Sequence, residues 1–376
     1  MDSSHLTDNP ENVRVRHRTE VNTRNRRSVV PPLSARTPWM VRNGRRASPR
    51  KGRLAPLAWS PMLTTLSPAP PVSGVAVERS EWMIAGRDAL ITWAPAKVNV
   101  HLEVTAKRAD GYHEVETLVL AVDLFDTLEV QIGNGDALTL DCDFSGMPTD
   151  SRNLVIRAAN ALRIKTGTTR GARIRLSKRI PAEAGLGGGS SDAATALLAL
   201  NRLWELNLTV EELRVVAAEV GSDVGVFLTP PAGWCTGRGE VVEPETPGGQ
   251  FYLVIVKPAA GLSTPAVYRQ VKVPVEPRSG DAARAALRAG DPEALARTLF
   301  NRLQEPAFEL APAAKAAFER LASCDPLGTL LSGSGSSLFA ICRDAGHARN
   351  VAARFRGSSS SSESVFVVRS YWPRSQ

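Results

Sequence analysis

A run of small residues, Pro181–Ser191, is the part of the sequence best suited to binding an anion. It contains four glycines within five positions, at 185 and at 187–189, followed by two serines. Glycine has no side chain to shield backbone amides, and the helical spacing of Ala193, Leu197 and Leu200 places the run at the start of a helix. Exposed N–H groups at the positive end of a helix favour a negative ligand, most commonly a phosphate. We therefore predict a phosphate-binding loop.

Three other interpretations of this run fit less well. A Walker A loop needs a Lys-Ser or Lys-Thr pair after its glycines, and none is present. The dinucleotide fingerprint needs a third glycine where Ser190 stands and an acidic residue at a strand end about twenty residues later. A plain helix-starting turn has no use for four glycines, which cost roughly 1 kcal/mol each in ordered backbone. A phosphate loop of another class is favoured.

An ammonium and a carboxylate form the second chemical feature. Lys97 and Asn99 alternate with valines, so period-two spacing puts their side chains on one face of a strand. Asp223 is the one acid in an otherwise apolar stretch, where it is either functional or a local turn cap. By itself Lys97 would be a solvated strand residue. Facing one hydroxyl together, the two groups would supply a proton acceptor and a charge clamp for phosphoryl transfer.

A polar turn at Arg108–His113 could recognise a substrate. Asp110-Gly111 is a typical turn pivot, and it would present Tyr112 and His113 together. A tyrosine ring offers a face on which a pyrimidine can stack, and a histidine can both donate and accept hydrogen bonds. The alternative is that the tyrosine packs against a sheet and the histidine caps a strand.

Strand and helix patterns alternate from Ala89 onward. We expect a break at Ala94–Ala96, and a capping box formed by Thr209 and Glu212. The pattern restarts after a glycine-rich segment, which indicates a second α/β domain. The expected strands are 89–93, 97–104, 114–122, 127–132, 172–180, 251–256, 338–342 and 365–369, and the expected helices include 153–165 and 209–220. The predicted division is 1–84 as a disordered extension, 85–242 as an N-terminal domain and 243–376 as a C-terminal domain.

The chain has 376 residues and a formal net charge of +8, but the excess is confined to one end. Residues 1–82 hold 14 Lys and Arg against 6 Asp and Glu, which leaves the remainder neutral. With no sustained apolar period, this extension is predicted to be disordered. It could reflect a start assigned too early, with Met83 or Met62 as the true beginning, an organelle transit peptide, or a nucleic-acid-binding arm.

Several classes of protein are excluded by composition. No run reaches the ~18 apolar residues of a membrane span, so no membrane partner is expected. The four cysteines are far apart and lack metal-ligand spacing, which is typical of reduced thiols in the cytosol. A neutral core argues against an RNA-binding protein led by the basic extension. We expect a cytoplasmic bacterial protein, or a plastid one if the extension is a transit peptide, and a monomer or homodimer.

Taken together, the motifs resemble the small-molecule kinases named after galactokinase, homoserine kinase, mevalonate kinase and phosphomevalonate kinase (GHMP kinases). The glycine run carries this resemblance, with Pro95–Asn99, Asp110–His113, Gly221–Phe227 and Leu331–Ser337 in the matching order over about residues 89–370. The Ala-Lys-Val-Asn and Asp-Gly-Tyr-His segments resemble most the member of non-mevalonate isoprenoid synthesis that acts on a cytidine diphosphate derivative of methylerythritol. A homoserine or mevalonate-type kinase is the alternative within the family.

The resemblance implies an α+β fold of two domains, the first with a left-handed β-α-β crossover and the second ferredoxin-like. It implies ATP and Mg²⁺ as cofactors, with Asp223 as the base and Lys97 beside it. Asn99, Tyr112, His113 and Thr264 would bind substrate. The resemblance leaves the protein ligands of Mg²⁺ open; ion chemistry favours phosphate oxygens and water, with the Ser191 hydroxyl as one candidate ligand. The residues expected to bind the ATP phosphates are Pro181, Ala182, Glu183, Ala184, Gly185, Leu186, Gly187, Gly188, Gly189, Ser190 and Ser191.

Two positions depart from the family pattern. Ala182-Glu183-Ala184 stands where the family usually has glycine or Met-Gly, which predicts a stiffer and more acidic first turn. Gly225 stands where the family usually has proline, which loosens the segment that carries Asp223. Neither change removes a proposed catalytic atom.

Overall fold

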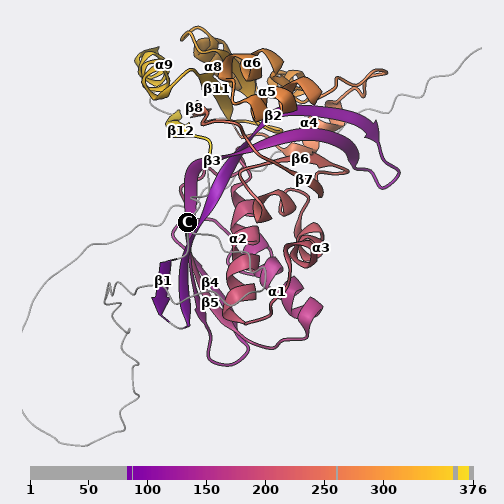
Figure 1. Cartoon of the computed structure of the whole chain (residues 1–376), viewed down its shortest axis with the longest axis vertical. Helices are drawn as coiled ribbons and strands as arrows, with labels where there is room; N and C mark the ends of the chain where they lie inside the picture. Colours follow the sequence, from indigo (N-terminus) through magenta and orange to yellow (C-terminus); the bar gives the residue numbers. More distant parts are fainter. Residues whose placement is uncertain (1–82, 87, 260, 359–362, 372–376) are drawn as a thin grey trace, which may run out of the picture. The chain divides into compact units, whose positions relative to one another are not determined.

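A computed structural model describes residues 83–86, 88–259, 261–358 and 363–371, which all belong to one compact unit (Figure 1). The predicted disordered extension, residues 1–84, lies outside the described residues except for its last two. These two begin strand β1 (Met83–Gly86), where Met83 pairs with Ile91 of the next strand. The first strand in the described residues therefore begins six residues before Ala89, where strand patterns were predicted to start.

Two long antiparallel strands, β2 (Ala89–Lys107) and β3 (His113–Ile132), form the central hairpin of this unit. The predicted break at Ala94–Ala96 was wrong, because β2 is continuous there. The pairing shifts in register between Pro95 and Ala96, whose partners on β3 are Phe125 and Val122. Such a bulge kinks a strand and increases its twist without ending it. One pair of strands can therefore run from the N-terminal sheet to the C-terminal half.

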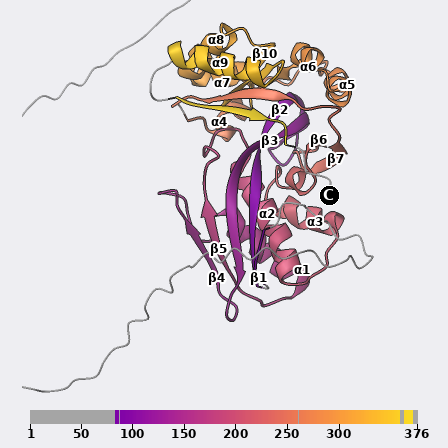
Figure 2. The same ribbon diagram turned by 60° about the vertical axis from the view of Figure 1, so that its left-hand side comes forward.

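The N-terminal sheet has the strand order β1-β2-β3-β5-β4, and three helices cover one of its faces (Figure 2). Strands β4 and β5 are parallel neighbours with α1 between them, which is the predicted β-α-β crossover; its handedness stays a prediction. Asn153 caps α1, and Thr209 and Glu212 form the predicted capping box of α3. The bounds are β4 (Leu138–Cys142), α1 (Leu154–Thr166), β5 (Ala172–Ser177), α2 (Gly188–Leu203) and α3 (Val210–Val220).

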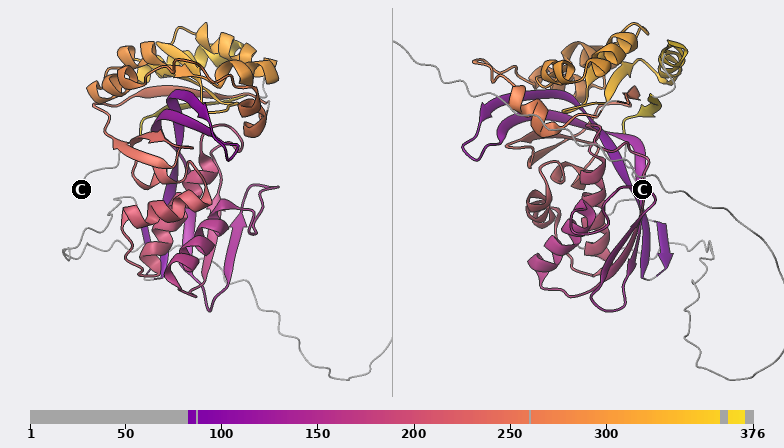
Figure 3. Two further views of the ribbon diagram at one scale, coloured as in Figure 1. Left: turned by 90° about the vertical axis from the view of Figure 1, so that its right-hand side faces the viewer. Right: turned by 180° about the vertical axis from the view of Figure 1, so that it is seen from behind.

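The second sheet is wholly antiparallel, with strand order β10-β11-β8-β12. In chain order these are strands 2-3-1-4, the arrangement of a ferredoxin-like domain. Helices cover its face away from β2 and β3 (Figure 3). The bounds are β8 (Tyr252–Lys257), α4 (Thr264–Gln270), α5 (Asp281–Ala289), α6 (Pro292–Thr298), α7 (Gln304–Leu310), α8 (Pro312–Ala322), β10 (Gly328–Leu331), β11 (Leu338–Cys342), α9 (Ala345–Ser358) and β12 (Ser364–Arg369). No helix in the described ranges is long and apolar enough to cross a membrane.

A shared core joins the two sheets. Val98 and Leu120 of the long hairpin belong to the same buried cluster as Phe251, just before β8, and Phe339 of β11. Each such side chain contributes about 1.5–3 kcal/mol on burial, so this apolar contact holds the halves together. The strands also cross over. Strand β7 (Val241–Glu245) pairs with β6 (Ala232–Thr236) in the first sheet, so the predicted boundary at 242/243 falls within β7. Strand β9 (Phe300–Asn301) pairs with β2.

Candidate active site

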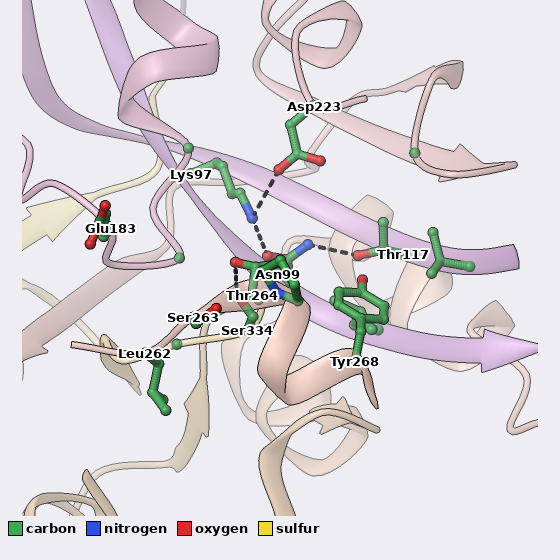
Figure 4. Close-up of a pocket in the computed structure, with 18 of the residues that line it drawn as sticks. Lys97, Asn99, Thr117, Glu183, Asp223, Leu262, Ser263, Thr264, Tyr268 and Ser334 are labelled. Atoms are coloured by element: carbon green, nitrogen blue, oxygen red, sulfur yellow. Dashed lines mark hydrogen bonds and ion pairs between the residues drawn. The ribbon is translucent and has the colours of Figure 1, made fainter. Parts of the chain in front are cut away.

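A cavity of about 540 Å³ opens between the long hairpin, the glycine run and the segment leading into α4 (Figure 4). Its walls come from segments far apart in the sequence, and they include charged, hydroxyl and apolar groups. The lining residues used below are Lys97, Asn99, Thr117, Glu183, Gly185, Gly187, Asp223, Arg238, Gly239, Thr264, Tyr268, Gly333 and Ser334.

Lys97 and Asp223 meet on the wall of this cavity. The Lys97 Nζ atom lies 3.6 Å from Asp223 Oδ2, and it also donates a hydrogen bond to Asn99 Oδ1. The lysine side chain is only 5% exposed, whereas the carboxylate is 50% exposed. The interpretation of Lys97 as a solvated strand residue is therefore wrong. The ammonium is held in place, and the carboxylate is open to a ligand.

A chain of hydrogen bonds fixes the orientation of Asn99. Its Nδ2 atom donates to Thr117 Oγ1 at 2.8 Å, and the Thr117 hydroxyl donates to the His101 carbonyl at 2.7 Å. Because the amide nitrogen is occupied by Thr117, the amide oxygen faces Lys97. Thr117 was not predicted, since its role depends on the pairing of β3 with β2.

At Gly185 and Gly187 the glycine run approaches neighbouring atoms too closely for a side chain. Gly185 has φ +74°, and a Cβ there would lie 2.1 Å from the Ser332 carbonyl oxygen. Gly187 has φ +70°, and its Cβ would lie 2.9 Å from Lys97 Cγ. The Leu186 carbonyl accepts a hydrogen bond from the Lys97 amide at 2.9 Å. The run is thus fastened directly to the strand that carries the ammonium.

Three of the eleven residues in the predicted phosphate loop line the cavity, at 183, 185 and 187. Ala184 and Leu186 are buried in the shared core, and the residues from Gly188 to Ser191 form the first turn of α2. Pro181 and Ala182 lie on the outer turn that precedes them. Glu183 has φ +50°, a left-handed conformation that costs a side-chain-bearing residue ~1–2 kcal/mol. This backbone is the reason that a glycine would be easier to accommodate there.

Helix α4 brings a hydroxyl and an aromatic ring to the opposite wall. The Thr264 hydroxyl lies 2.7 Å from that of Ser334. Tyr268, four residues later on the same helix face, lines the cavity as well. Burial, with a smaller effect of the Asp223 charge, raises the pKa of the Tyr268 phenol, so the phenol is neutral. Sequence reasoning missed Tyr268, although its spacing from Thr264 was a usable signal.

Tyr112 and His113 lie beside the cavity and are not among the residues that line it. The predicted turn is present: Gly111 has φ +87°, and the Tyr112 amide donates to Asp110 Oδ1 at 3.0 Å. The His113 ring stacks at 5.3 Å from the ring of Tyr268. Burial and, secondarily, the charge of Lys107 lower the pKa of His113, so its imidazole is neutral at pH 7.

A buried charge cluster supports the start of α2. Lys178 Nζ contacts both Asp126 Oδ2 and Asp192 Oδ2, the latter at 2.8 Å, and all three side chains are nearly inaccessible. The sequence favours Asp192 as an acid of the first helical turn that stabilises the helix dipole, but the side chain faces inward to Lys178, and the first turn of α2 holds no acidic residue. Burial raises the pKa of Asp192 to about 8, while Lys178 opposes the shift. The cluster lies behind the phosphate loop and does not line the cavity.

The described residues contain no cluster of three or more histidine, cysteine or acidic side chains suited to a metal ion. One hydroxyl at the loop could still act as a ligand, because Ser191 Oγ is buried and lacks a hydrogen-bond partner within the described ranges. Glu183 is the carboxylate on the same loop that lines the cavity. A magnesium ion bound mainly through phosphate oxygens needs few protein ligands, so this sparse set fits it.

Two family models match parts of the described unit. The model of the GHMP kinases N terminal domain matches residues 153–230, and that of the GHMP kinases C terminal region matches residues 283–359. Proteins named 4-diphosphocytidyl-2-C-methyl-D-erythritol kinase are similar over most of their length. The one from Pelotomaculum thermopropionicum is 39% identical over 75% of this chain and 98% of its own, and the one from Listeria innocua is 36% identical over 75% and 96%.

Solved structures agree with these matches. A crystal structure of 4-(cytidine 5'-diphospho)-2C-methyl-D-erythritol kinase superposes with a TM-score of 0.63 at 35% identity, over 74% of this chain and 98% of the other. The homoserine kinase from Cytophaga hutchinsonii superposes with a TM-score of 0.59 over 80% of this chain and 97% of its own. At 18% identity the latter shows a shared fold and nothing finer.

Proposed function

The chain belongs to the GHMP kinases and, among them, to the 4-diphosphocytidyl-2-C-methyl-D-erythritol kinases, and from this premise we propose how its cavity works. The reaction transfers the γ-phosphoryl group of ATP to the 2-hydroxyl of 4-diphosphocytidyl-2-C-methyl-D-erythritol, in the non-mevalonate synthesis of isoprenoid precursors. The observation that carries the proposal is the contact of Lys97 with Asp223 at 3.6 Å, beside the glycine run.

Asp223 is the proton acceptor in this proposal. Its carboxylate is half exposed on the cavity wall, where a substrate hydroxyl can reach it. The hydroxyl oxygen attacks the γ-phosphorus, its proton passes to the carboxylate, and the bond from phosphorus to the β–γ bridging oxygen breaks to release ADP. General-base help of this kind typically contributes ~10²–10⁴-fold in rate.

Lys97 positions the carboxylate and balances negative charge on the attacking oxygen. Asn99 accepts a hydrogen bond from its ammonium, which leaves the nitrogen directed between Asn99 and Asp223 (Figure 4). A charge fixed in advance stabilises a transition state without reorganisation at the moment of reaction. The close packing of Gly187 on Lys97 then sets the distance between this group and the phosphates.

The glycine run is proposed to hold the ATP phosphates. Its residues line one wall of the cavity, and its C-terminal part forms the first turn of a sixteen-residue helix whose amides favour an anion. Bound Mg²⁺ would neutralise phosphate charge during transfer, and Ser191 and Glu183 are the side chains that could hold it. ATP and Mg²⁺ are therefore the proposed cofactors.

The opposite end of the cavity is proposed to hold the cytidine. Tyr268 lines this end, and its ring stacks with that of His113. Aromatic faces bind bases at about 1–3 kcal/mol per base, and a neutral imidazole can read the edge of cytosine. Thr264 and Asn99 line the same cavity and offer polar groups to the substrate.

Phosphate transfer from ATP by the purified chain tests the proposal. Asp223→Asn and Lys97→Met should each lower kcat by at least about 100-fold while ATP affinity, measured by calorimetry, is retained. Homoserine and mevalonate serve as alternative acceptors in the same assay. Transfer to either of them, without transfer to the cytidine substrate, would contradict the proposal, as would near-normal turnover of both variants.

A further inference from the structure

Arg238 is a cation in the cavity that the mechanism above does not use. It sits on the tight turn between β6 and β7, where Gly237 has φ +73° and Gly239 has φ +114°. The turn is fixed to the long hairpin, because the Gly237 carbonyl accepts the Val115 amide at 2.8 Å. A side chain on so constrained a turn has a defined position.

The guanidinium of Arg238 has hydrogen-bonding capacity to spare. Its Nε atom lies 3.5 Å from Glu240 Oε1, and its Cζ lies 5.1 Å from the centre of the Tyr112 ring. Within the described residues, neither terminal nitrogen has a hydrogen-bond partner. Arginine presents these nitrogens as a planar fork that matches phosphate oxygens.

The β6–β7 turn lies between the two ends of the cavity. On one side, Arg238 covers the ring of Tyr112, on the hairpin that also carries His113. On the other, a Cβ on the adjacent Gly239 would lie 3.5 Å from Asp223 Oδ1. A ligand that reaches from the aromatic end to the carboxylate must therefore pass this turn.

The charges on the cavity wall show what the middle of such a ligand should be. Among the described residues, the cations that line the cavity are Lys97 and Arg238, and the first is already engaged by Asn99 and Asp223. A diphosphate placed between a base and an alcohol carries negative charge that needs compensation in a partly enclosed site. Arg238 is the cation placed to provide it.

We propose that Arg238 binds the diphosphate bridge of the substrate and so makes the cavity selective for a nucleoside diphosphate over a nucleoside. This inference rests on the proposed function, because it assigns the cytidine to the aromatic end and the acceptor hydroxyl to Asp223. Arg238 is then a specificity-determining residue that acts in binding and takes no part in the proton transfer.

The test compares CDP and cytidine as ligands of the full chain by calorimetry, alongside steady-state kinetics. Arg238→Gln should weaken CDP binding roughly 10- to 100-fold, the range for a charge-assisted hydrogen-bonded contact, with cytidine binding essentially unchanged. The Michaelis constant for the cytidine substrate should rise by a similar factor, while kcat and the Michaelis constant for ATP stay near those of the parent. Arg238→Lys should be intermediate, because it keeps the charge and loses the fork.

Arg152→Gln is the matched control. Arg152 is an exposed arginine that pairs with Asp150 at 2.8 Å and does not line the cavity. Its loss should leave the preference for CDP intact. The inference alone would be overturned if Arg238→Gln weakened the binding of CDP and cytidine equally, or weakened neither, while the parent chain is active. A parent chain unable to phosphorylate the cytidine substrate would overturn the proposed function and the inference with it.

Discussion

Asp192 should make the stability of this protein depend on pH in a way that one substitution removes. Its carboxyl is buried directly after the first turn of α2, with one oxygen 2.8 Å from Lys178 Nζ and the other without a hydrogen-bond partner in the described ranges. Lys178 also contacts Asp126, so one ammonium serves two carboxyl groups. Burial raises the pKa of Asp192 from 3.8 to about 8, so its neutral form is favoured at pH 7.

The sign follows from proton counting. Between pH 3.8 and about 8 the folded state holds a proton on Asp192 that the unfolded chain has lost. The free energy of unfolding contributed by this group is therefore greatest at low pH, and it falls by ~1.4 kcal/mol per pH unit as pH rises through that window. From pH 5.5 to 7.5 the loss amounts to about 2–3 kcal/mol. The Lys178 pKa is raised above its ordinary value, so lysine titration lies outside this range.

Asp192→Asn isolates the effect, because asparagine keeps the shape and cannot ionise. At pH 5.5 the variant should match the parent to within about 1 kcal/mol, the size of one altered hydrogen bond. By pH 7.5 it should have gained roughly 2–3 kcal/mol relative to the parent, since only the parent loses the favourable proton. Urea unfolding followed by circular dichroism at several pH values measures the free energy of unfolding of both proteins. Subtracting one from the other removes the contribution of titrating groups that the two share.

Lys178→Met provides the contrasting variant. It leaves two buried carboxyl groups without their cation, and breaking such a contact typically costs about 3–5 kcal/mol. A difference between Asp192→Asn and the parent that stays flat from pH 5.5 to 7.5 would refute the reasoning. It would mean that Asp192 is ionised in the folded protein.

Three further predictions concern the loop, the hairpin and the extension. Gly187→Ala should lower kcat at least 10-fold and reduce Tm, because its Cβ would lie 2.9 Å from Lys97 Cγ and it requires φ +70°. Gly189→Ala, with only an ordinary contact at 3.6 Å, should keep the parental Tm. His113→Ala should raise the Michaelis constant for the cytidine substrate and reduce discrimination against the uridine analogue, with ATP unaffected; equal loss for both nucleotides would assign His113 to the fold. A chain starting at Met83, the first residue of β1, should keep its Tm and activity and bind heparin less, and a lower Tm would contradict this.

Much of the local structure could be predicted from sequence because its causes are local. Asn153 and the pair Thr209 and Glu212 cap their helices with their own side chains. Period-two spacing placed Lys97 and Asn99 on one face, and their side chains do hydrogen-bond to each other. The predicted break at Pro95 was wrong for a long-range reason. Strand β3 pairs with β2 on both sides of Pro95, and a shift in register there keeps β2 intact.

The residues that make up the site were harder to predict from the sequence. Tyr268, Thr117 and Arg238 line the cavity, and none of them belongs to a recognisable sequence motif. Each is brought there by pairing or packing between segments distant in the chain: β3 against β2, α4 against the cavity, and the β6–β7 turn against the long hairpin. A sequence pattern reports periods and caps of a few residues, so it contains no direct record of these contacts.

The sequence by itself therefore determined the chemistry that is carried by contiguous residues: a glycine run at a helix start, a hairpin turn with a tyrosine and a histidine, and a lysine and asparagine on one strand face. Only the tertiary structure decided that Asp223 lies 3.6 Å from Lys97, and that Asp192 faces inward to share Lys178. The physical reason is that burial of the core joining the two sheets fixes which distant side chains meet. Backbone propensity fixes only what each segment does alone.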